Sequence, residues 1–194
     1  MPIRRRTYYR AAKQSYSVYK NTRPINIPTP HAADNIPNNR IIRSASVIVC
    51  QNAANNGNYI PPVMKVKHVR VQCTIPPVPA AIVQGCLQIR FVVLYVPEGM
   101  NVQIHPRLDN AQPQNQLYVT AGTLDDHPEW IMGERVINFN AQGSTLTSIN
   151  CRVNRNLKSG DMVVLVAVAY FNNNFNDAVG IPVISTISYA CRAN

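Results

Sequence analysis

The chain has 194 residues, of which 46% are hydrophobic and only 14% are charged, and its formal net charge is +10 at pH 7. This length suits one domain with a real core. No apolar run is long enough to span a bilayer as a helix, and no secretory signal is visible, so neither a membrane-spanning nor a secreted protein is expected. A surface poor in charge but rich in Asn and Gln indicates that much of it is buried against identical neighbours.

The first 40 residues are predicted to be a basic N-terminal arm that ends in an extended Pro/Asn-rich linker, Asn21–Asn39. Residues 1–43 contain nine Lys or Arg and one acid, a net +8, which leaves +2 for the rest of the chain. Lys and Arg gain affinity by releasing counterions from phosphate, and tyrosine rings stack on unpaired bases. We therefore predict that the arm binds single-stranded nucleic acid. The residues predicted to bind it are Arg4, Arg5, Arg6, Tyr8, Tyr9, Arg10, Lys13, Tyr16, Tyr19, Lys20 and Arg23.

Other interpretations of the arm remain open. A short basic run such as Arg4, Arg5 and Arg6 is also typical of a solvated tail or of a nuclear import signal, and import by host receptors is compatible with nucleic-acid binding. A membrane-surface role is disfavoured because the arm lacks an apolar stripe and its prolines, such as Pro24 and Pro28, prevent a continuous amphipathic helix. No membrane partner is therefore expected.

Residues 41–194 are predicted to form one β domain, because the sequence shows no internal repeat and no second domain. Met162–Phe171 is apolar at both parities, which predicts a central strand. Lys65 and Lys67 share the parity of the apolar positions that follow them, which predicts a bulge or edge transition near His68. The expected strands are Ile41–Cys50, Val63–Ile75, Leu87–Val96, Thr147–Val153, Met162–Phe171 and Val183–Cys191.

Helix signals are nearly absent. The best candidate is a turn or two at Asp126–Met132, with Asp125 or Asp126 as the N-cap and Gly133 as the stop. The only tryptophan, Trp130, is most simply a core or interface anchor. Fifteen prolines and about eight short strands indicate an all-β fold. We predict a single eight-stranded antiparallel jelly-roll sandwich with an extended basic N-terminal arm and at most short helical turns.

Lys158, Ser159, Gly160 and Asp161 are predicted to form a structural turn between two strands. Gly160 can take a positive φ, and the Asp161 carboxylate can accept hydrogen bonds from nearby amide groups. Taken alone, this is the chemistry of an ordinary hairpin.

The sequence carries no recognisable catalytic, cofactor or metal motif. Its four histidines are scattered, and no phosphate-binding or dinucleotide-binding loop occurs. Asp125, Asp126, Glu129 and Glu134, with His127 among them, could hold Ca²⁺ at a subunit contact, but helix capping and an exposed loop explain them at least as well. We expect no cofactor, no bound metal and no enzyme activity. The five cysteines are expected to be free thiols inside strands: Cys50, Cys73, Cys86, Cys151 and Cys191.

Two stretches of the chain resemble a known family. Arg155–Asp161, followed by the apolar Met162–Tyr170, resembles the R-x-L-x-S-G-D turn and strand of capsid proteins from small circular single-stranded DNA viruses, the circovirus-like group that encodes a replication initiator. Val92–Gly99 is similar to their strand that ends in Y-V-P-x-G, and the basic arm is similar to theirs. These motifs cover a small part of the domain, together with the arm.

The resemblance implies a structural capsid protein that self-assembles into a small icosahedral shell of about sixty identical subunits. The arms would lie on the inner side and package a single-stranded DNA genome by neutralising its charge. The implied location is the virion, and the host nucleus during assembly.

Two other functions stay open. A capsid protein of a small single-stranded RNA or satellite virus would share the fold and the arm. A cellular single-stranded nucleic-acid-binding β-domain would carry its stacking aromatic residues on one sheet face, whereas the aromatic residues of this domain are few and dispersed.

Overall fold

Most described residues lie in β-strands. The computed structural model describes residues 16–27, 40–49, 63–97, 128–138, 144–172 and 180–193. Among them, no helix is long and apolar enough to cross a membrane. The strands are β1 (Ser17–Ile27), β2 (Arg40–Val49), β3 (Val63–Ile75), β4 (Cys86–Val96), β5 (Ile131–Asn138), β6 (Thr145–Lys158), β7 (Met162–Phe171) and β8 (Ile181–Ala193), and the short helices are α1 (Ala80–Gly85) and a 3-10 turn (Pro128–Trp130).

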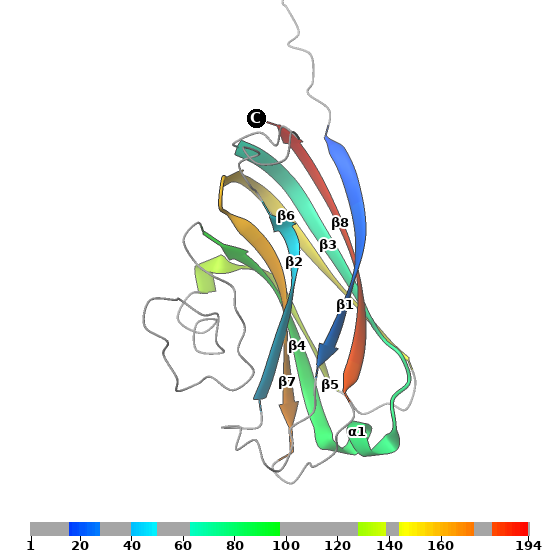
Figure 1. Cartoon of the computed structure of the whole chain (residues 1–194). Helices are drawn as coiled ribbons and strands as arrows, with labels where there is room; N and C mark the ends of the chain where they lie inside the picture. Colours follow the sequence, from blue (N-terminus) through cyan, green and yellow to red (C-terminus); the bar gives the residue numbers. More distant parts are fainter. Residues whose placement is uncertain are drawn as a thin grey trace, which may run out of the picture.

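The eight strands form two four-stranded sheets that pack face to face (Figure 1). One sheet has the order β1-β8-β3-β6 and the other the order β2-β7-β4-β5, and every pair is antiparallel. Only β4 and β5 are consecutive strands of one sheet, so every other connection crosses from one sheet to the other. The strand order and the crossings are those of a jelly roll. The predicted fold class is therefore confirmed.

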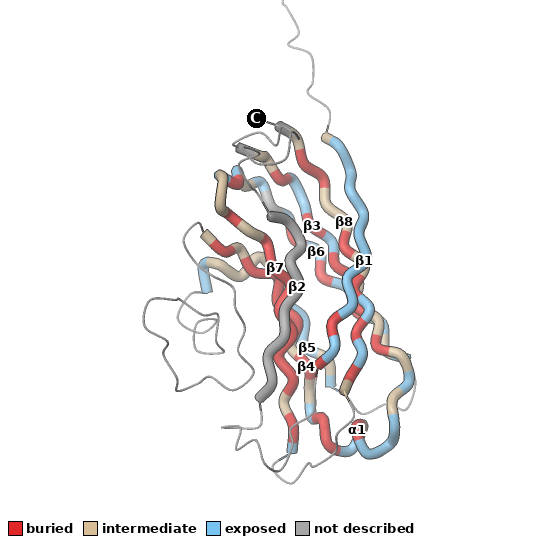
Figure 2. Tube along the Cα trace, viewed as in Figure 1, coloured by how far each residue is buried: buried red, intermediate tan, exposed pale blue. Residues whose placement is uncertain are grey.

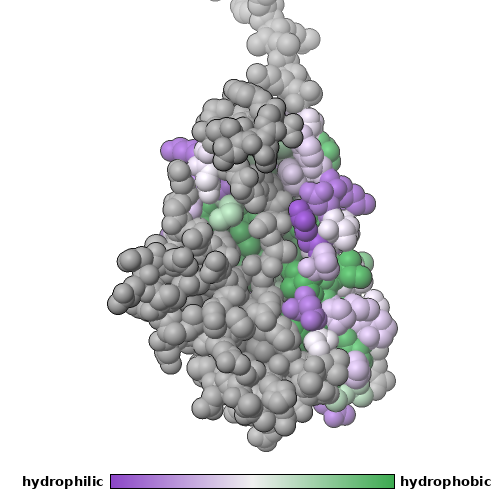
Figure 3. Space-filling view, in the orientation of Figure 1, coloured by the Kyte–Doolittle hydropathy of each residue, from purple (hydrophilic) through white to green (hydrophobic). Residues whose placement is uncertain are grey.

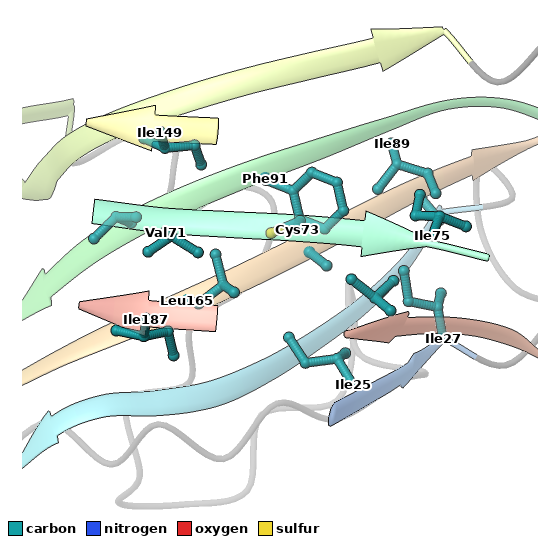
Figure 4. Packing of buried hydrophobic residues seen from close by; sticks show 14 of the residues in the cluster. Ile25, Ile27, Val71, Cys73, Ile75, Ile89, Phe91, Ile149, Leu165 and Ile187 are labelled. Carbon is teal, nitrogen blue, oxygen red and sulfur yellow. The ribbon is translucent and has the colours of Figure 1, made fainter. Parts of the chain in front are cut away.

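The core lies between the sheets and is built from alternate residues of each strand. Figure 4 shows Phe91, Ile89 and Leu165 of one sheet pointing toward Val71 and Ile75 of the other. These side chains are at most 1% exposed. Burying a side chain of this size contributes about 1.5–3 kcal/mol, so the two inner faces hold the sandwich together.

A second apolar cluster lies on the other side of the β2-β7-β4-β5 sheet. Its members alternate with the core residues of β4 and β7, so both strands are buried on both faces (Figure 2). Trp130 packs against this cluster, which agrees with the anchoring role expected for it. The cluster consists of Val92, Leu94, Val96, Val164, Val166 and Val168.

Most strands agree closely with the sequence patterns, but β6 is longer than the predicted Thr147–Val153 because it continues to Lys158. The bounds of β3 and β7 are those expected, and β7 is a central strand of its sheet. The pairing of β3 with both neighbours shifts register between Val66 and His68, which confirms the predicted bulge.

One strand lies where the sequence analysis expected the arm and linker. Ser17–Ile27 is β1, which pairs with β8 along its whole length. The sandwich therefore begins before residue 41, and part of Asn21–Asn39 is a strand rather than a linker. Edge strands tolerate proline because one side of the strand has no partner, and β1 is an edge strand that contains Pro24. Its first eight residues are all exposed, so this part of the strand has no buried apolar alternation by which the sequence could have predicted it.

The helical prediction was partly wrong. The described part of the predicted turn is the 3-10 turn Pro128–Trp130, and Met132 and Gly133 belong to β5. A Cβ atom at Gly133 would lie 2.8 Å from the Cys151 sulfur, so this glycine lets β5 cross close to β6 rather than ending a helix. Strand β5 and helix α1 were not predicted.

Candidate nucleic-acid interface

The β1-β8-β3-β6 sheet, named the basic sheet from here on, contains no acidic residue. Its four strands contribute nine Lys or Arg, whereas the four strands of the other sheet contribute four and one acid, Glu134. A surface with one sign of charge attracts a polyanion. The nine are Lys20, Arg23, Lys65, Lys67, Arg70, Arg152, Arg155, Lys158 and Arg192.

Strand alternation sends most of these cations to the outer side of the basic sheet. In β3, Val69, Val71 and Cys73 are buried toward the core while Arg70 between them is exposed. The same parity applies in the neighbouring strands. This outer surface is named the basic face, and its cations are Lys20, Lys65, Lys67, Arg70, Arg152, Lys158 and Arg192, with His68.

The strand register aligns the polar residues of the basic face in rows. Arg70 is paired with Asn150 of β6 on one side and with Ser188 of β8 on the other, and Ser188 is paired with Lys20 of β1. In the next row, His68 is paired with Arg152. Rows that face the same way are about 7 Å apart along a strand. Cations therefore alternate with amide and hydroxyl groups across the face.

The bulge in β3 adds a cation to the basic face. Lys67 has no register partner, and both Lys67 and His68 are exposed although they are consecutive. In a regular strand one of them would point into the core. The bulge thus turns two neighbouring polar side chains outward, as bulges do where a strand must aim a side chain.

A groove lies over the bulge. Its volume is about 830 Å³. Tyr16, which directly precedes β1, lies at its edge, with the Lys67 Nζ 5.4 Å and the Arg192 Cζ 5.2 Å from its ring centroid. The groove is lined by Tyr16, Lys67, His68, Val69, Arg70, Asn150, Cys151, Arg152, Asn154 and Ser188.

The structure describes four of the eleven residues predicted to bind nucleic acid. Tyr16 lies at the groove, and Lys20 lies on the basic face in the row of Arg70. Tyr19 stacks on Tyr189, with ring centroids 5.3 Å apart. Burial raises the pKa of Tyr189, an effect that the charge of Arg23 opposes. The predicted residues outside the described part of the chain are Arg4, Arg5, Arg6, Tyr8, Tyr9, Arg10 and Lys13.

The segment Lys158–Asp161 forms a tight turn. Gly160 has a φ of 92°, the positive value that the sequence predicted. The Asp161 N–H donates to the Lys158 carbonyl at 3.0 Å, and the Lys158 N–H donates to the Asp161 carboxylate at 2.7 Å. The turn is not a hairpin, however, because β6 and β7 belong to different sheets. It closes one end of the sandwich.

The two motifs that carried the family resemblance meet at this turn. The Arg155 guanidinium lies over the Tyr95 ring, with its Cζ 4.0 Å from the ring centroid. The Tyr95 hydroxyl donates a hydrogen bond to the buried Asp161 carboxylate. The pKa of Tyr95 is raised, first by burial of the tyrosine and second by the nearby Asp161 carboxylate. Tyr95 comes from one sheet and Arg155 from the other. The motif residues therefore join the sheets, which gives them a structural role.

The other candidate groups do not form a second site among the described residues. No group of three or more His, Cys, Asp or Glu that could hold a metal ion occurs there. Asp125, Asp126 and His127 lie outside the described residues, while Glu134 forms an ion pair with Arg90, Nη2 to Oε2 at 2.7 Å.

The four described cysteines are buried free thiols: Cys73, Cys86, Cys151 and Cys191. Burial raises the pKa of each of them. They are therefore poor nucleophiles.

No family model and no curated protein matches the chain. Among solved structures, the chain is similar to the semi-empty virus-like particle of the nodavirus of the giant freshwater prawn Macrobrachium rosenbergii, with 10% identity over 100% of this chain and 92% of that chain and a TM-score of 0.47. It is similar to turnip yellow mosaic virus with 12% identity over 90% and 93% of the two chains and a TM-score of 0.40. The decameric BFDV capsid protein matches with 10% identity over 91% and 97% and a TM-score of 0.37. Each likeness is distant, so the function is inferred from the residues of this chain.

Sequence reasoning missed the basic face. The chain after residue 43 has a net charge of only +2, which suggested a nearly neutral domain. The available signal was the charge of each strand, because Val63–Ile75 and Thr145–Lys158 each hold three Lys or Arg and no acid. That these strands share a sheet could be learned only from the structure.

Proposed function

We propose that the protein is a structural capsid protein that packages single-stranded nucleic acid, and that the nucleic acid is DNA. The observation that carries the proposal is an acid-free basic sheet continuous with the basic arm. Tyr16 is the last residue before β1, and it contacts Lys67 and Arg192 of the basic face. The arm thus joins the sandwich at the cationic end of the sheet, so both can neutralise the same polyanion.

Self-association is supported by the exposed surface. Large apolar side chains are exposed on several strands: Val18 is 71%, Leu146 67% and Leu87 58% exposed. On the side where Figure 1 draws β1, Figure 3 shows hydrophobic residues among hydrophilic ones. Exposed apolar groups of this kind support burial against other subunits, as does a composition with only 14% charged residues.

The charge balance fits a packaging role. About sixty copies of residues 1–43, each with a net +8, supply on the order of 500 positive charges, which offsets part of a genome of a few thousand nucleotides. The basic face supplies further cations from residues beyond that segment. The specific assignment to DNA, to import through Arg4, Arg5 and Arg6 and to assembly in the host nucleus rests on the family resemblance.

The test is the size and content of the purified protein. Sixty subunits of 21.6 kDa predict a particle of about 1.3 MDa by light scattering. Nucleic acid released from the particle should be degraded by DNase and by a nuclease specific for single strands, but not by RNase. A protein that stays monomeric at high concentration contradicts the capsid role and favours the cellular binding domain. A particle filled with RNA instead supports the single-stranded RNA virus alternative.

A further inference from the structure

We propose that the groove over the β3 bulge is a second binding site for single-stranded nucleic acid, separate from the arm. The site would hold the sugar-phosphate backbone against Lys67, Arg70 and Arg152. It goes beyond the packaging role of the arm, and it does not require shell assembly.

The first argument is uncompensated charge. Lys67, Arg70 and Arg152 are exposed around one groove, and the four strands of the basic sheet supply no carboxylate to pair with them. By contrast, Arg90 on the other sheet pairs with Glu134 at 2.7 Å. Clustered cations without an acid on the same sheet repel one another, and phosphate groups would relieve that repulsion.

The second argument is the neutral lining. Asn150 and Ser188 flank Arg70 in adjacent strands, and Asn154 lies further along β6. Amide and hydroxyl groups both donate and accept hydrogen bonds, which suits sugars and unpaired base edges better than sulfate or phosphate alone. Tyr16 adds an aromatic ring at the edge of the groove. Cations beside an aromatic ring are the combination that binds single strands without sequence preference.

The third argument is the position of the groove. Ser17 is paired with Cys191, so β1 starts at the end of the sheet that carries Lys65 and Arg192. The arm therefore enters the sheet beside the groove. A strand bound by the arm can continue onto the basic face without a gap.

The experiment compares matched variants of the full chain that each lose two positive charges. The groove variant carries Arg70→Gln and Arg152→Gln, and the control carries Arg90→Gln and Arg135→Gln, which belong to the other sheet and lie outside the groove. Both are made in a chain whose arm is neutralised by Gln at Arg4, Arg5, Arg6, Arg10 and Lys13. Binding of a fluorescein-labelled oligothymidylate of twelve nucleotides is measured by anisotropy over a range of salt concentrations. Circular dichroism melting checks that each variant is folded.

The groove variant should bind about tenfold more weakly at low salt, and the slope of log affinity against log salt should fall by about 1.4, since each lost phosphate contact removes about 0.7. The control should change neither value. Arg70→Lys with Arg152→Lys keeps the charge and should retain the slope, which separates lost contacts from altered folding. Equal effects in the groove and control variants would overturn the site.

A second comparison tests the class of ligand. Inorganic polyphosphate of matched charge should compete less well than unlabelled oligothymidylate, and Tyr16→Leu should remove that advantage. Equal competition by both polyanions in the parent would overturn the nucleic-acid assignment and leave a general polyanion site. Particle formation is measured on the same variants with intact arms. If particles form but the groove variant binds oligothymidylate as well as the control does, only the groove site is contradicted. If the groove variant binds more weakly but no particles form, only the capsid role is contradicted.

Discussion

The two sheets of this sandwich have the same number of strands, but the outer surface of one is mainly polar and cationic while that of the other is mainly apolar. The basic sheet presents cations, amides and hydroxyls outward, with some exposed apolar residues such as Val18 and Leu146, and carries nine Lys or Arg without an acid. On the other sheet, β4 and β7 present valine and leucine, with Val92, Leu94 and Val166 fully buried. The same alternation rule produces both outcomes, because only the residues at the outward positions differ.

This difference separates the tasks of the two sheets. Strands buried on both faces are held in place by packing and tolerate little change. A sheet with one polar face needs only its inner side for stability, so its outer side is free to bind. The roles that we propose for the two sheets can therefore be tested by substitutions at matched outward positions.

The largest expected effect comes from placing a carboxylate on each outer face. Val166→Asp puts an unpaired charge at a position that is 0% exposed, so we expect a loss of at least several kcal/mol and little folded protein. Thr186→Asp on the basic face should change the free energy of unfolding by no more than about 1 kcal/mol. It should instead weaken binding of oligothymidylate, because it adds an acid to a sheet that has none. Urea denaturation and anisotropy measure the two effects, and similar stability losses would show that the faces do not differ in this way.

A smaller effect is expected at alkaline pH, from thiols on the inner faces. Burial raises the pKa of Cys73 and of Cys86 to about 12, and that of Cys151 to about 11, from 9.0. These thiols stay protonated in the folded state while the unfolded chain loses their protons above pH 9. Stability should therefore be constant below pH 9 and fall by several kcal/mol as the pH rises toward 12.

Unfolding measured from pH 7 to pH 11 checks this fall. Cys73→Ala on the basic sheet and Cys86→Ala on the other should each flatten it, although both lower the stability at pH 7 by leaving a small cavity. A fall of unchanged steepness in both variants would assign the alkaline sensitivity to other groups, of which Tyr95 is the first candidate because its pKa is also raised.

The smallest effect concerns the turn that joins the sheets. Gly160→Ala should cost about 1–2 kcal/mol, because a Cβ atom disfavours a φ of 92°. Gly160→Asn should cost less, since asparagine tolerates positive φ better than alanine does. The melting temperature should fall by roughly 2–4 °C for each kcal/mol lost in a chain of this size. An alanine variant as stable as the parent would mean that the turn relaxes without strain.

Much of the fold could be predicted from local patterns. The apolar run Met162–Phe171 specified a central strand because a strand between two neighbours and under two layers needs apolar residues at both parities. The change of parity between Lys67 and Val69 specified the bulge, since a buried face must be kept across it. The positive φ of Gly160 followed from the residue type.

The tertiary structure decided which distant segments became neighbours. It placed Ser17–Ile27 at the edge of a sheet, although the exposed side of that strand leaves no apolar pattern in the sequence. It placed the Arg155 Cζ of one sheet 4.0 Å from the Tyr95 ring centroid of the other. It also collected four strands without acids, far apart in the chain, into one basic face. The sequence alone determines which residues alternate and how many charges each strand has, because these are local properties. The partners of each strand depend on how both inner faces bury their apolar area together, which no single segment encodes.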